Sequence, residues 1–321
     1  MPSIRLFFLI LLLLVSPLAS SADATVELPH EVNVNGVEMM LIPAGWFWYT
    51  VSVDNHLLPV GTRPFREVRV WLDSFYLAKY EARARDLVRF MNAGAVLPQT
   101  LVQHTGDKDI LVAPGDPKPQ NCTILKKSDG AWELVTQNGD LPATDLSWAL
   151  AAEFAAWMGL RLPTEAEWEK GARGGDKRVF PWGSVYPDDT YGRFDWAREG
   201  CNQEPVDAYP KGRSPYGLYN MAGNVSEYVV DWFNQGFDDA LRDGVRNPHP
   251  ASEGSPIPFE LPQRISKGGG WTRNPIALDI GWRSTAEPFR SSSRDGVRFA
   301  ADVSTVRADL AKQAELLKES K

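Results

Sequence analysis

Hydrophobic and polar residues alternate along several short stretches of the chain, which predicts short β-strands joined by loops. Residues 39–42 form an apolar run that ends at a Pro-Ala-Gly turn, and residues 66–75 alternate between apolar and polar side chains. Residues 123–125 and 132–135 flank an Asp-Gly pair, which is typical of a hairpin. From residue 179 to residue 301 a helical period is almost absent. We therefore expect short strands and long loops over this second half.

Helical spacing of apolar residues occurs in a few stretches. Residues 81–91 and 148–158 show it, and a glycine follows each of them. Thr164 and Glu167 have the spacing of a capping box, in which each side chain accepts a hydrogen bond from the other residue's backbone N–H. A helix is therefore predicted to begin there and to run to residue 173. Residues 304–321 are predicted to form an appended C-terminal helix with Ser304 as its cap.

The first 24 residues have the features of a secretory signal peptide. Arg5 is the only charge before an apolar run at residues 6–15, and small residues follow up to Ala24. This run is too short to span a bilayer comfortably, so we expect cleavage after Ala22 or Ala24, with an uncleaved anchor as the alternative. No cysteine follows it, which argues against a lipoprotein. The mature protein is expected in the periplasm or outside the cell, without a stable membrane span.

Composition narrows the functional classes. The 321-residue chain carries a formal net charge of -7 and has no basic face, which excludes a nucleic-acid partner. Its 12 Trp, 26 Gly and 24 Pro residues indicate a loop-rich fold with an aromatic core. Cys122 and Cys201 are the only cysteines. In an oxidising compartment they would form one disulfide or stay as two buried thiols, and no CxxC spacing indicates a redox or metal pair.

One loop, residues 217–228, has the composition of a cation site. Asn220, Asn224 and Glu227 offer side-chain oxygens, and two glycines permit the backbone angles of a tight loop. Calcium takes roughly six to eight oxygen ligands of these kinds. Spacing alone favours a simpler interpretation, a Gly/Asn turn before a strand at residues 227–232. The two alternatives are separated only by the motifs that surround the loop.

Those motifs resemble the signature of the formylglycine-generating enzymes, also called sulfatase-modifying factors. The signature is carried by Leu-Arg-Leu-Pro-Thr-Glu-Ala-Glu-Trp-Glu at 160–169, Ala-Arg-Gly-Gly at 172–175 and Phe-Pro-Trp-Gly at 180–183. Segments 40–45, 75–81, 216–232, 267–271 and 296–300 resemble further family motifs in the same order. The resemblance covers residues 37–302. It implies one α+β domain with a C-type-lectin-like core, little regular secondary structure and bound structural calcium.

The resemblance also implies which residues hold calcium. In the family one calcium ion is held by residues that match Asn220, Gly223, Val225 and Glu227, the two middle ones through their backbone carbonyls. A second family calcium site needs an asparagine where this chain has Arg193. We therefore carry over the first site and not the second.

The family's catalytic residues are missing from this sequence. Formylglycine-generating enzymes oxidise a substrate cysteine with oxygen and with copper held by two cysteines shortly after the Gly-Gly-Ser-aromatic motif. The matching stretch here, residues 271–283, has no cysteine. A second branch binds iron through a His-x3-His-x-Glu arrangement, and none of the four histidines of this chain, His30, His56, His104 and His249, lies near another in sequence. A third branch consists of secreted members without these cysteines, some of which act in maturation of secreted metabolites, such as the oxidation of the pyoverdine chromophore.

Charged residues cluster within and just after this stretch. Glu287, Asp279 and Arg273 are candidate catalytic residues, because a carboxylate among arginines and tryptophans can act as a general base or bind a polar aromatic ligand. The alternative is that Arg283 and Arg298 are core arginines and that Glu287 is a surface charge. The sequence has no nucleophile–base pair and no flavin or nicotinamide fingerprint.

Two functions therefore remain as hypotheses. The favoured one is an exported oxidoreductase that oxidises or tailors a small molecule or peptide without thiol-bound copper, because the whole scaffold is kept. The alternative is a non-catalytic binding or accessory module. True sulfatase activation is not expected. The sequence identifies neither the catalytic metal nor the ligand.

Overall fold

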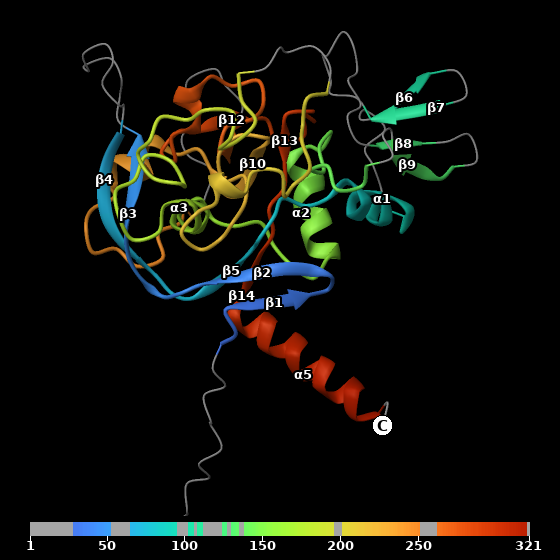
Figure 1. Cartoon of the computed structure of the whole chain (residues 1–321), viewed down its shortest axis with the longest axis horizontal. Coiled ribbons are helices and arrows are strands. Elements are labelled where there is room, and N and C mark those ends of the chain that lie inside the picture. Colours follow the sequence, from blue (N-terminus) through green and yellow to red (C-terminus); the bar gives the residue numbers. More distant parts are fainter. Residues whose placement is uncertain are drawn as a thin grey trace, which may run out of the picture.

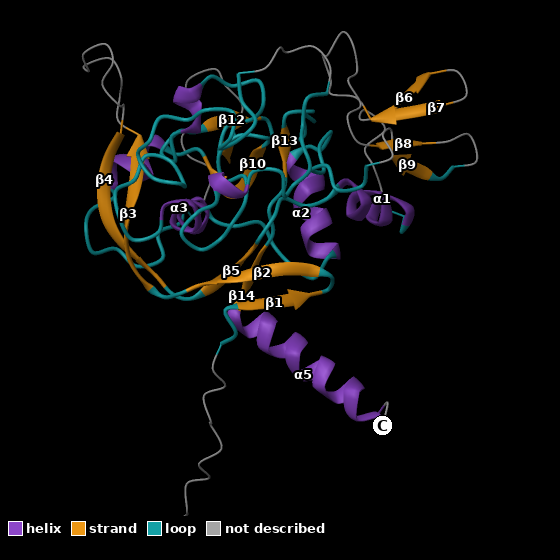
Figure 2. Cartoon of the chain, in the orientation of Figure 1, coloured by secondary structure: helices purple, strands orange, loops and turns teal. Residues whose placement is uncertain are grey.

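The computed structural model describes residues 28–52, 65–94, 102–105, 108–111, 124–126, 130–134, 138–195, 201–250 and 262–319. Loops make up much of the body, and small sheets and helices are set among them (Figures 1 and 2). The predicted signal peptide, residues 1–24, lies outside the described residues. Within them, no helix combines the length and the apolar character that crossing a membrane requires.

Four small sheets organise the described residues. One contains, in order, β1 (Glu31–Val34), β2 (Val37–Ile42), β5 (Phe75–Ala78) and β14 (Ala300–Asp302), all antiparallel. A second contains β12 (Ser284–Ala286), β11 (Arg264–Lys267), β10 (Ser226–Trp232) and β13 (Asp295–Gly296). The others are the pair β3 (Gly45–Ser52) and β4 (Phe65–Leu72), and the meander β6 (Val102–Thr105), β7 (Lys108–Leu111), β8 (Ile124–Lys126) and β9 (Trp132–Leu134). Because β14 pairs with β5, the first sheet joins the two ends of the domain.

Five α-helices complete the described part of the chain. They are α1 (Ala84–Asn92), α2 (Trp148–Trp157), α3 (Glu165–Arg173), α4 (Gln235–Ala240) and α5 (Val303–Glu319). The capping box of α3 is confirmed, with Thr164 Oγ1 accepting from the Glu167 N–H at 3.1 Å and Glu167 accepting from the Thr164 N–H at 2.8 Å. The hairpin of β8 and β9 is confirmed as well.

Three local predictions differ from the structure. Residues 66–75 form two strands, because the chain turns at Asp73, whose carboxylate accepts hydrogen bonds from the Trp71 indole and the Asn247 amide, both at 2.9 Å. The short helix α4 was not predicted, since six residues are too few to show a period. Helix α5 begins at Val303, so Ser304 lies inside its first turn and does not cap it.

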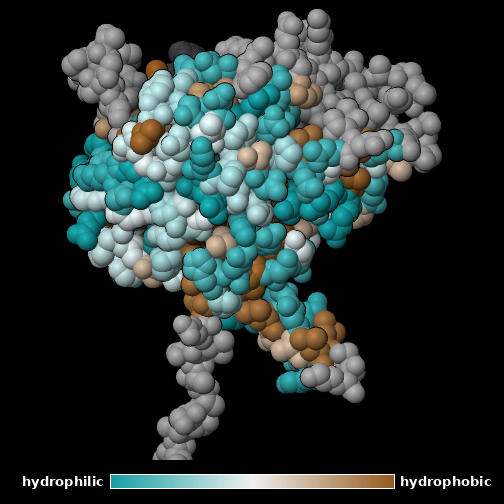
Figure 3. All heavy atoms as spheres, in the orientation of Figure 1, coloured by the Kyte–Doolittle hydropathy of each residue, from teal (hydrophilic) through white to brown (hydrophobic). Residues whose placement is uncertain are grey.

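Helix α3 lies in the interior of the body (Figure 1). Ala166, Trp168 and Ala172 are buried in the cluster that also contains residues of β3, β4 and β5. A Cβ at Gly171 would stand 2.4 Å from the Leu77 side chain, so glycine permits this close approach of helix and strand. Helix α5 instead projects from the body, and Figure 3 shows hydrophobic atoms gathered toward it beneath a mainly hydrophilic face.

Candidate functional site

The buried face of α3 carries charged residues that anchor the surrounding loops. Glu165 accepts a hydrogen bond from Arg283 Nε at 2.5 Å and lies 3.0 Å from Lys267 Nζ. Arg283 also pairs with Asp238. Burial opposes ionisation of Glu165, but the charges of Arg283 and Lys267 outweigh it and hold the pKa of this carboxyl below its usual value. The network therefore consists of ionised groups that compensate one another.

The segment 271–283, where the sequence predicts the chemistry, is held at both ends and by backbone hydrogen bonds from Asp195 N–H to Arg273 O and from Ile280 N–H to Val179 O. Trp271 is fully buried, and its backbone N–H donates to Asn224 O at 2.8 Å. Arg283 at the other end is fixed by the ion pairs to Glu165 and Asp238. Between these anchors the chain forms a short 3₁₀ turn, Pro275–Leu278, and Ile276 is 65% exposed. Residues 273, 274 and 276 are thus presented to solvent, whereas residues 277–281 are buried.

The three candidate catalytic residues occupy different environments. Asp279 is buried, and its Oδ1 accepts the Gly281 N–H at 2.8 Å, so it closes the local turn. Arg273 is exposed and lies 3.4 Å from Ser284 Oγ. Glu287 has a side chain 47% exposed, at 3.7 Å from Arg290. The structure therefore places Arg273 and Glu287 at the surface and Asp279 inside the turn.

The arginines of the alternative interpretation are core residues. Arg298 is fully buried and donates to Glu227 through Nε at 2.8 Å and through Nη2 at 2.6 Å. The side chain of Arg283 is 6% exposed. Both guanidinium groups connect segments that are distant in sequence, and their geometry agrees with a structural role.

The loop 217–228 is buried and tightly folded. Asn220 and Asn224 both adopt left-handed backbone angles, with φ of 52° and 60°. Gly223 has φ of 88°, and a Cβ there would stand 2.8 Å from the Arg193 carbonyl oxygen, so no other residue fits without a shift. Glu227, at the start of β10, is fully buried between Arg298 and the Trp168 indole, which donates at 2.6 Å.

Glu81 completes this cluster and was missed in the sequence. Its carboxylate accepts from Asn220 Nδ2 at 2.8 Å and from Asn224 Nδ2 at 3.1 Å. Burial, together with the nearby charge of Glu227, raises the pKa of Glu81 to about 8. The only sequence signal was its position at the end of the 75–81 motif, because its partners lie 139 and 143 residues further along the chain.

These residues fit a hard cation. The two amide nitrogens of Asn220 and Asn224 are turned toward Glu81, which leaves Asn220 Oδ1 buried without a hydrogen-bond donor. Such an orphaned acceptor costs roughly 1–3 kcal/mol unless a water or an ion satisfies it. Glu81 and Glu227 add two buried carboxylates beside the single guanidinium of Arg298. The oxygen chemistry suits calcium, and a bound cation would favour the ionised form of Glu81, whose pKa is raised without it.

At the second family calcium position a side-chain cation takes the place of a ligand. Arg193 Nε donates to the Asn202 carbonyl at 2.9 Å, and Arg193 Nη1 lies 3.6 Å from Glu204 Oε1. Oxygens of this stretch therefore already face a guanidinium group. Close by in sequence, Cys201 is disulfide-bonded, and the chain's other cysteine, Cys122, lies outside the described residues.

Comparison with known proteins gives a consistent family and fold. Residues 25–303 match the family described as a sulfatase-modifying factor enzyme 1-like domain. Formylglycine-generating enzyme of Mus musculus is 31% identical over 301 residues, which cover 83% of this chain and 75% of that enzyme. Hercynine oxygenase of Mycobacterium tuberculosis is 33% identical over 170 residues, covering 51% of this chain and 37% of that protein.

Among solved structures, PvdO from Pseudomonas aeruginosa matches with a TM-score of 0.59 at 24% identity, covering 85% of this chain and 98% of that one. This likeness shows a shared fold and confirms the predicted single-domain α+β class. The formylglycine-generating enzyme and the hercynine oxygenase are oxidative enzymes, with which an oxidoreductase is consistent.

Proposed function

The chain belongs to the sulfatase-modifying factor family, and from this premise we propose that it is an exported enzyme that oxidises or tailors a small molecule or peptide without thiol-bound copper. One observation carries the proposal. The family scaffold extends over residues 25–303, while residues 271–283 contain no cysteine. Copper(I) prefers soft thiolate ligands, so a family member without them needs a different oxidative route.

The state of Cys201 supports the same conclusion. Its sulfur is in a disulfide and so is not a thiolate that could bind copper. The N-terminal apolar run supports export, since a disulfide persists in the oxidising compartments that exported proteins reach.

The exposed part of the segment, together with Glu287 just after it, is the proposed substrate surface. Arg273 and Glu287 are both accessible, and Ile276 offers apolar area next to Arg273 in sequence. A guanidinium group beside apolar surface suits a substrate that carries an acidic or polar aromatic group. We assign Arg273 and Glu287 to substrate contact and Asp279 to the turn that presents them. The catalytic metal is not assigned.

Calcium is proposed as a structural ion. Asn220 and Glu227 would hold it through side-chain oxygens, and Gly223 and Val225 through backbone carbonyls, as the family implies. A bound calcium ion would supply positive charge to the buried carboxylates. The unpartnered Oδ1 of Asn220 is the observation that supports this assignment.

The proposed activity can be tested in a strain that normally makes this protein and from which its gene has been deleted. The strain is complemented with wild-type protein or with the Arg273→Ala variant, and its exported small molecules and peptides are compared by mass spectrometry. Wild-type protein should yield a product that differs from its precursor by loss of two hydrogens or gain of one oxygen. Arg273→Ala should lower its yield about tenfold, since a hydrogen bond to a charged group contributes roughly 1.5 kcal/mol.

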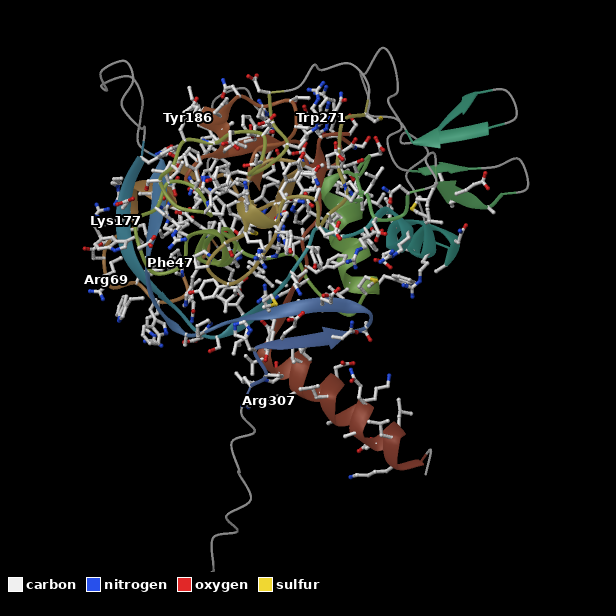
Figure 4. The ribbon with its side chains drawn as sticks, in the orientation of Figure 1. Phe47, Arg69, Lys177, Tyr186, Trp271 and Arg307 are labelled. Carbon is white, nitrogen blue, oxygen red and sulfur yellow. The ribbon has the colours of Figure 1, made fainter. Side chains whose placement is uncertain are left out.

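The control for this experiment is Arg307→Ala. Arg307 is an exposed arginine on α5, at the opposite end of the molecule from Trp271 in Figure 4. This variant should retain full yield. Identical exported products with and without the chain would overturn the enzymatic proposal.

A binding or accessory module is the second candidate. It is favoured by one observation, that the acidic residue inside the segment, Asp279, is already used by the turn. This function predicts retention of a ligand by the purified protein with no change in the ligand's mass.

A further inference from the structure

A cavity lies away from the segment 271–283. It has a volume of about 230 Å³ and is formed by the turn between β4 and β5, the N-terminal turn of α3, residues 247–249 and the end of β14. Strands β5 and β14 lie at the lower edge of the body in Figure 1, whereas Trp271 lies near the upper edge in Figure 4, which has the same orientation. The cavity is therefore separate from the proposed substrate surface.

His249 lines this cavity, and one of its two ring nitrogens is hydrogen-bonded to Asp231. Its Nδ1 lies 3.2 Å from Asp231 Oδ1, and Asp231 is only 2% exposed. The other oxygen of Asp231 accepts the Glu165 N–H at 2.7 Å, which fixes the carboxylate in place. A carboxylate can only accept, so the proton of the neutral ring resides on Nδ1 and Nε2 is the free acceptor. The side chain of His249 is 40% exposed, so a ligand can reach it.

The charged side chains among the remaining lining residues are acidic. Asp73, Glu167 and Asp302 contribute carboxylates, and none of the described lining residues is a lysine or arginine. Arg161 contacts both Glu167 and Asp302 at 2.7 Å, and Arg246 lies 3.1 Å from Asp73. Asp231, which bonds the His249 ring, is a fourth carboxylate. Four carboxylates around the cavity are therefore accompanied by only the two directly paired guanidinium groups of Arg161 and Arg246.

The charge balance at His249 is negative. Its hydrogen bond to Asp231, together with the charges of Asp231 and Glu167, raises the pKa of His249, against the opposing effects of burial and of Arg264. The N-terminus of α3 does not reverse this balance, because its first N–H groups already donate to Glu167 and Asp231. Lys170 is committed to backbone carbonyls of Pro43 and Gly45. An anion would be repelled here, and a cation with hydrogen-bond donors would be attracted.

We propose that this cavity binds the ammonium group of a small amine or of a peptide amine, which donates a hydrogen bond to Nε2 of His249 and is surrounded by the carboxylates of Asp73, Glu167 and Asp302. The volume admits a short alkyl chain behind the ammonium group. The site is independent of the oxidative function proposed above. If the cavity does not bind amines, the result of the exported-product experiment is unaffected, so the two proposals fail independently.

Binding and protonation at His249 are then linked. Ammonium binding disfavours the imidazolium form, so it lowers the pKa of His249, and by reciprocity binding tightens as pH rises through that pKa. The groups that face the ring are Asp231 from β10, Glu167 from α3 and Arg264 from β11.

The test uses n-butylammonium chloride and the purified full chain. The Hε1 proton NMR signal of His249, one of four histidines, is followed against pH and assigned by its loss in His249→Asn. This variant keeps an amide donor for Asp231, and a single cooperative melting transition shows that it folds. Butylammonium should lower the pKa of His249, sodium chloride at equal ionic strength should not, and butyltrimethylammonium, which lacks N–H donors, should have a smaller effect.

A matched pair of charge variants separates the cavity from the general surface. Asp73→Asn should weaken butylammonium binding about threefold, the effect of one solvent-accessible charge. Asp188→Asn removes an exposed carboxylate outside the cavity and should leave binding unchanged. An unshifted His249 titration, an equal shift with sodium chloride or butyltrimethylammonium, or equal effects of the two variants would overturn the proposal.

Discussion

The loop 217–228 and the segment 271–283 use similar residue types in opposite ways. In the loop, Asn220 and Glu227 are buried and bonded to Glu81 and Arg298, which are distant in sequence. In the segment, the Asp279 carboxylate accepts a local N–H from Gly281, and the exposed Arg273 side chain lies near Ser284, while the backbone is held by bonds from Asp195 to Arg273 and from Ile280 to Val179. The two regions meet where the Trp271 N–H donates to Asn224 O. Buried, paired charges here define the fold, and exposed ones remain available to a ligand.

Substitution of Glu227 tests the difference between the buried loop and the exposed segment most strongly. Glu227→Ala leaves the guanidinium group of Arg298 buried without its carboxylate, which should lower the free energy of unfolding by roughly 3–5 kcal/mol. Urea unfolding followed by tryptophan fluorescence measures this effect. The matched control is Glu287→Ala at the surface, with an expected change within about 0.5 kcal/mol. Similar losses for the two variants would contradict the distinction between the regions.

Calcium removal should have the next largest effect. An ion bound only by the folded state adds about 2.7 kcal/mol at a hundredfold excess over its Kd. EDTA should therefore lower the melting temperature, and calcium should restore it. Asn220→Ala should abolish the calcium response, whatever its own melting temperature. Melting curves that coincide with and without calcium would leave the loop as a plain turn.

Loss of a local helix cap should have a smaller effect. Thr164→Ala removes the hydroxyl that accepts from the Glu167 N–H and should cost about 1 kcal/mol in thermal unfolding. Ser304→Ala, inside the first turn of α5, serves as the control and should be close to neutral. A larger loss at Ser304 than at Thr164 would show that the cap assignments are reversed.

These cases show what could be predicted from sequence. The capping box and the β8–β9 hairpin depend on residues a few positions apart, so local spacing was sufficient. The family motifs predicted the fold, because several occur in order. Glu81 and the pair of Glu165 with Arg283 were not predictable, since their partners lie more than a hundred residues away. Sequence proximity suggested that Asp279 and Glu287 act together, but Asp279 is buried and Glu287 is exposed.

The pH dependence at His249 should be the smallest effect on stability. The folded-state pKa is raised above 6.5, so the pair with Asp231 stabilises the protein fully below pH 6.5 and loses this contribution as pH rises through the raised pKa. The loss should stay below about 1 kcal/mol because the ring is partly exposed. The difference in unfolding free energy between wild-type protein and His249→Asn should shrink across that window. A difference that grows with pH would contradict the sign.

The central claim is that this family member works without thiol-bound copper, and copper(I) affinity tests it most directly. The purified, oxidised protein is titrated against a copper(I)-chelator complex whose colour reports the bound metal. With Cys201 in a disulfide and no cysteine in residues 271–283, the chelator should keep its copper. Transfer of one equivalent of copper(I) from the chelator to the protein would contradict the account.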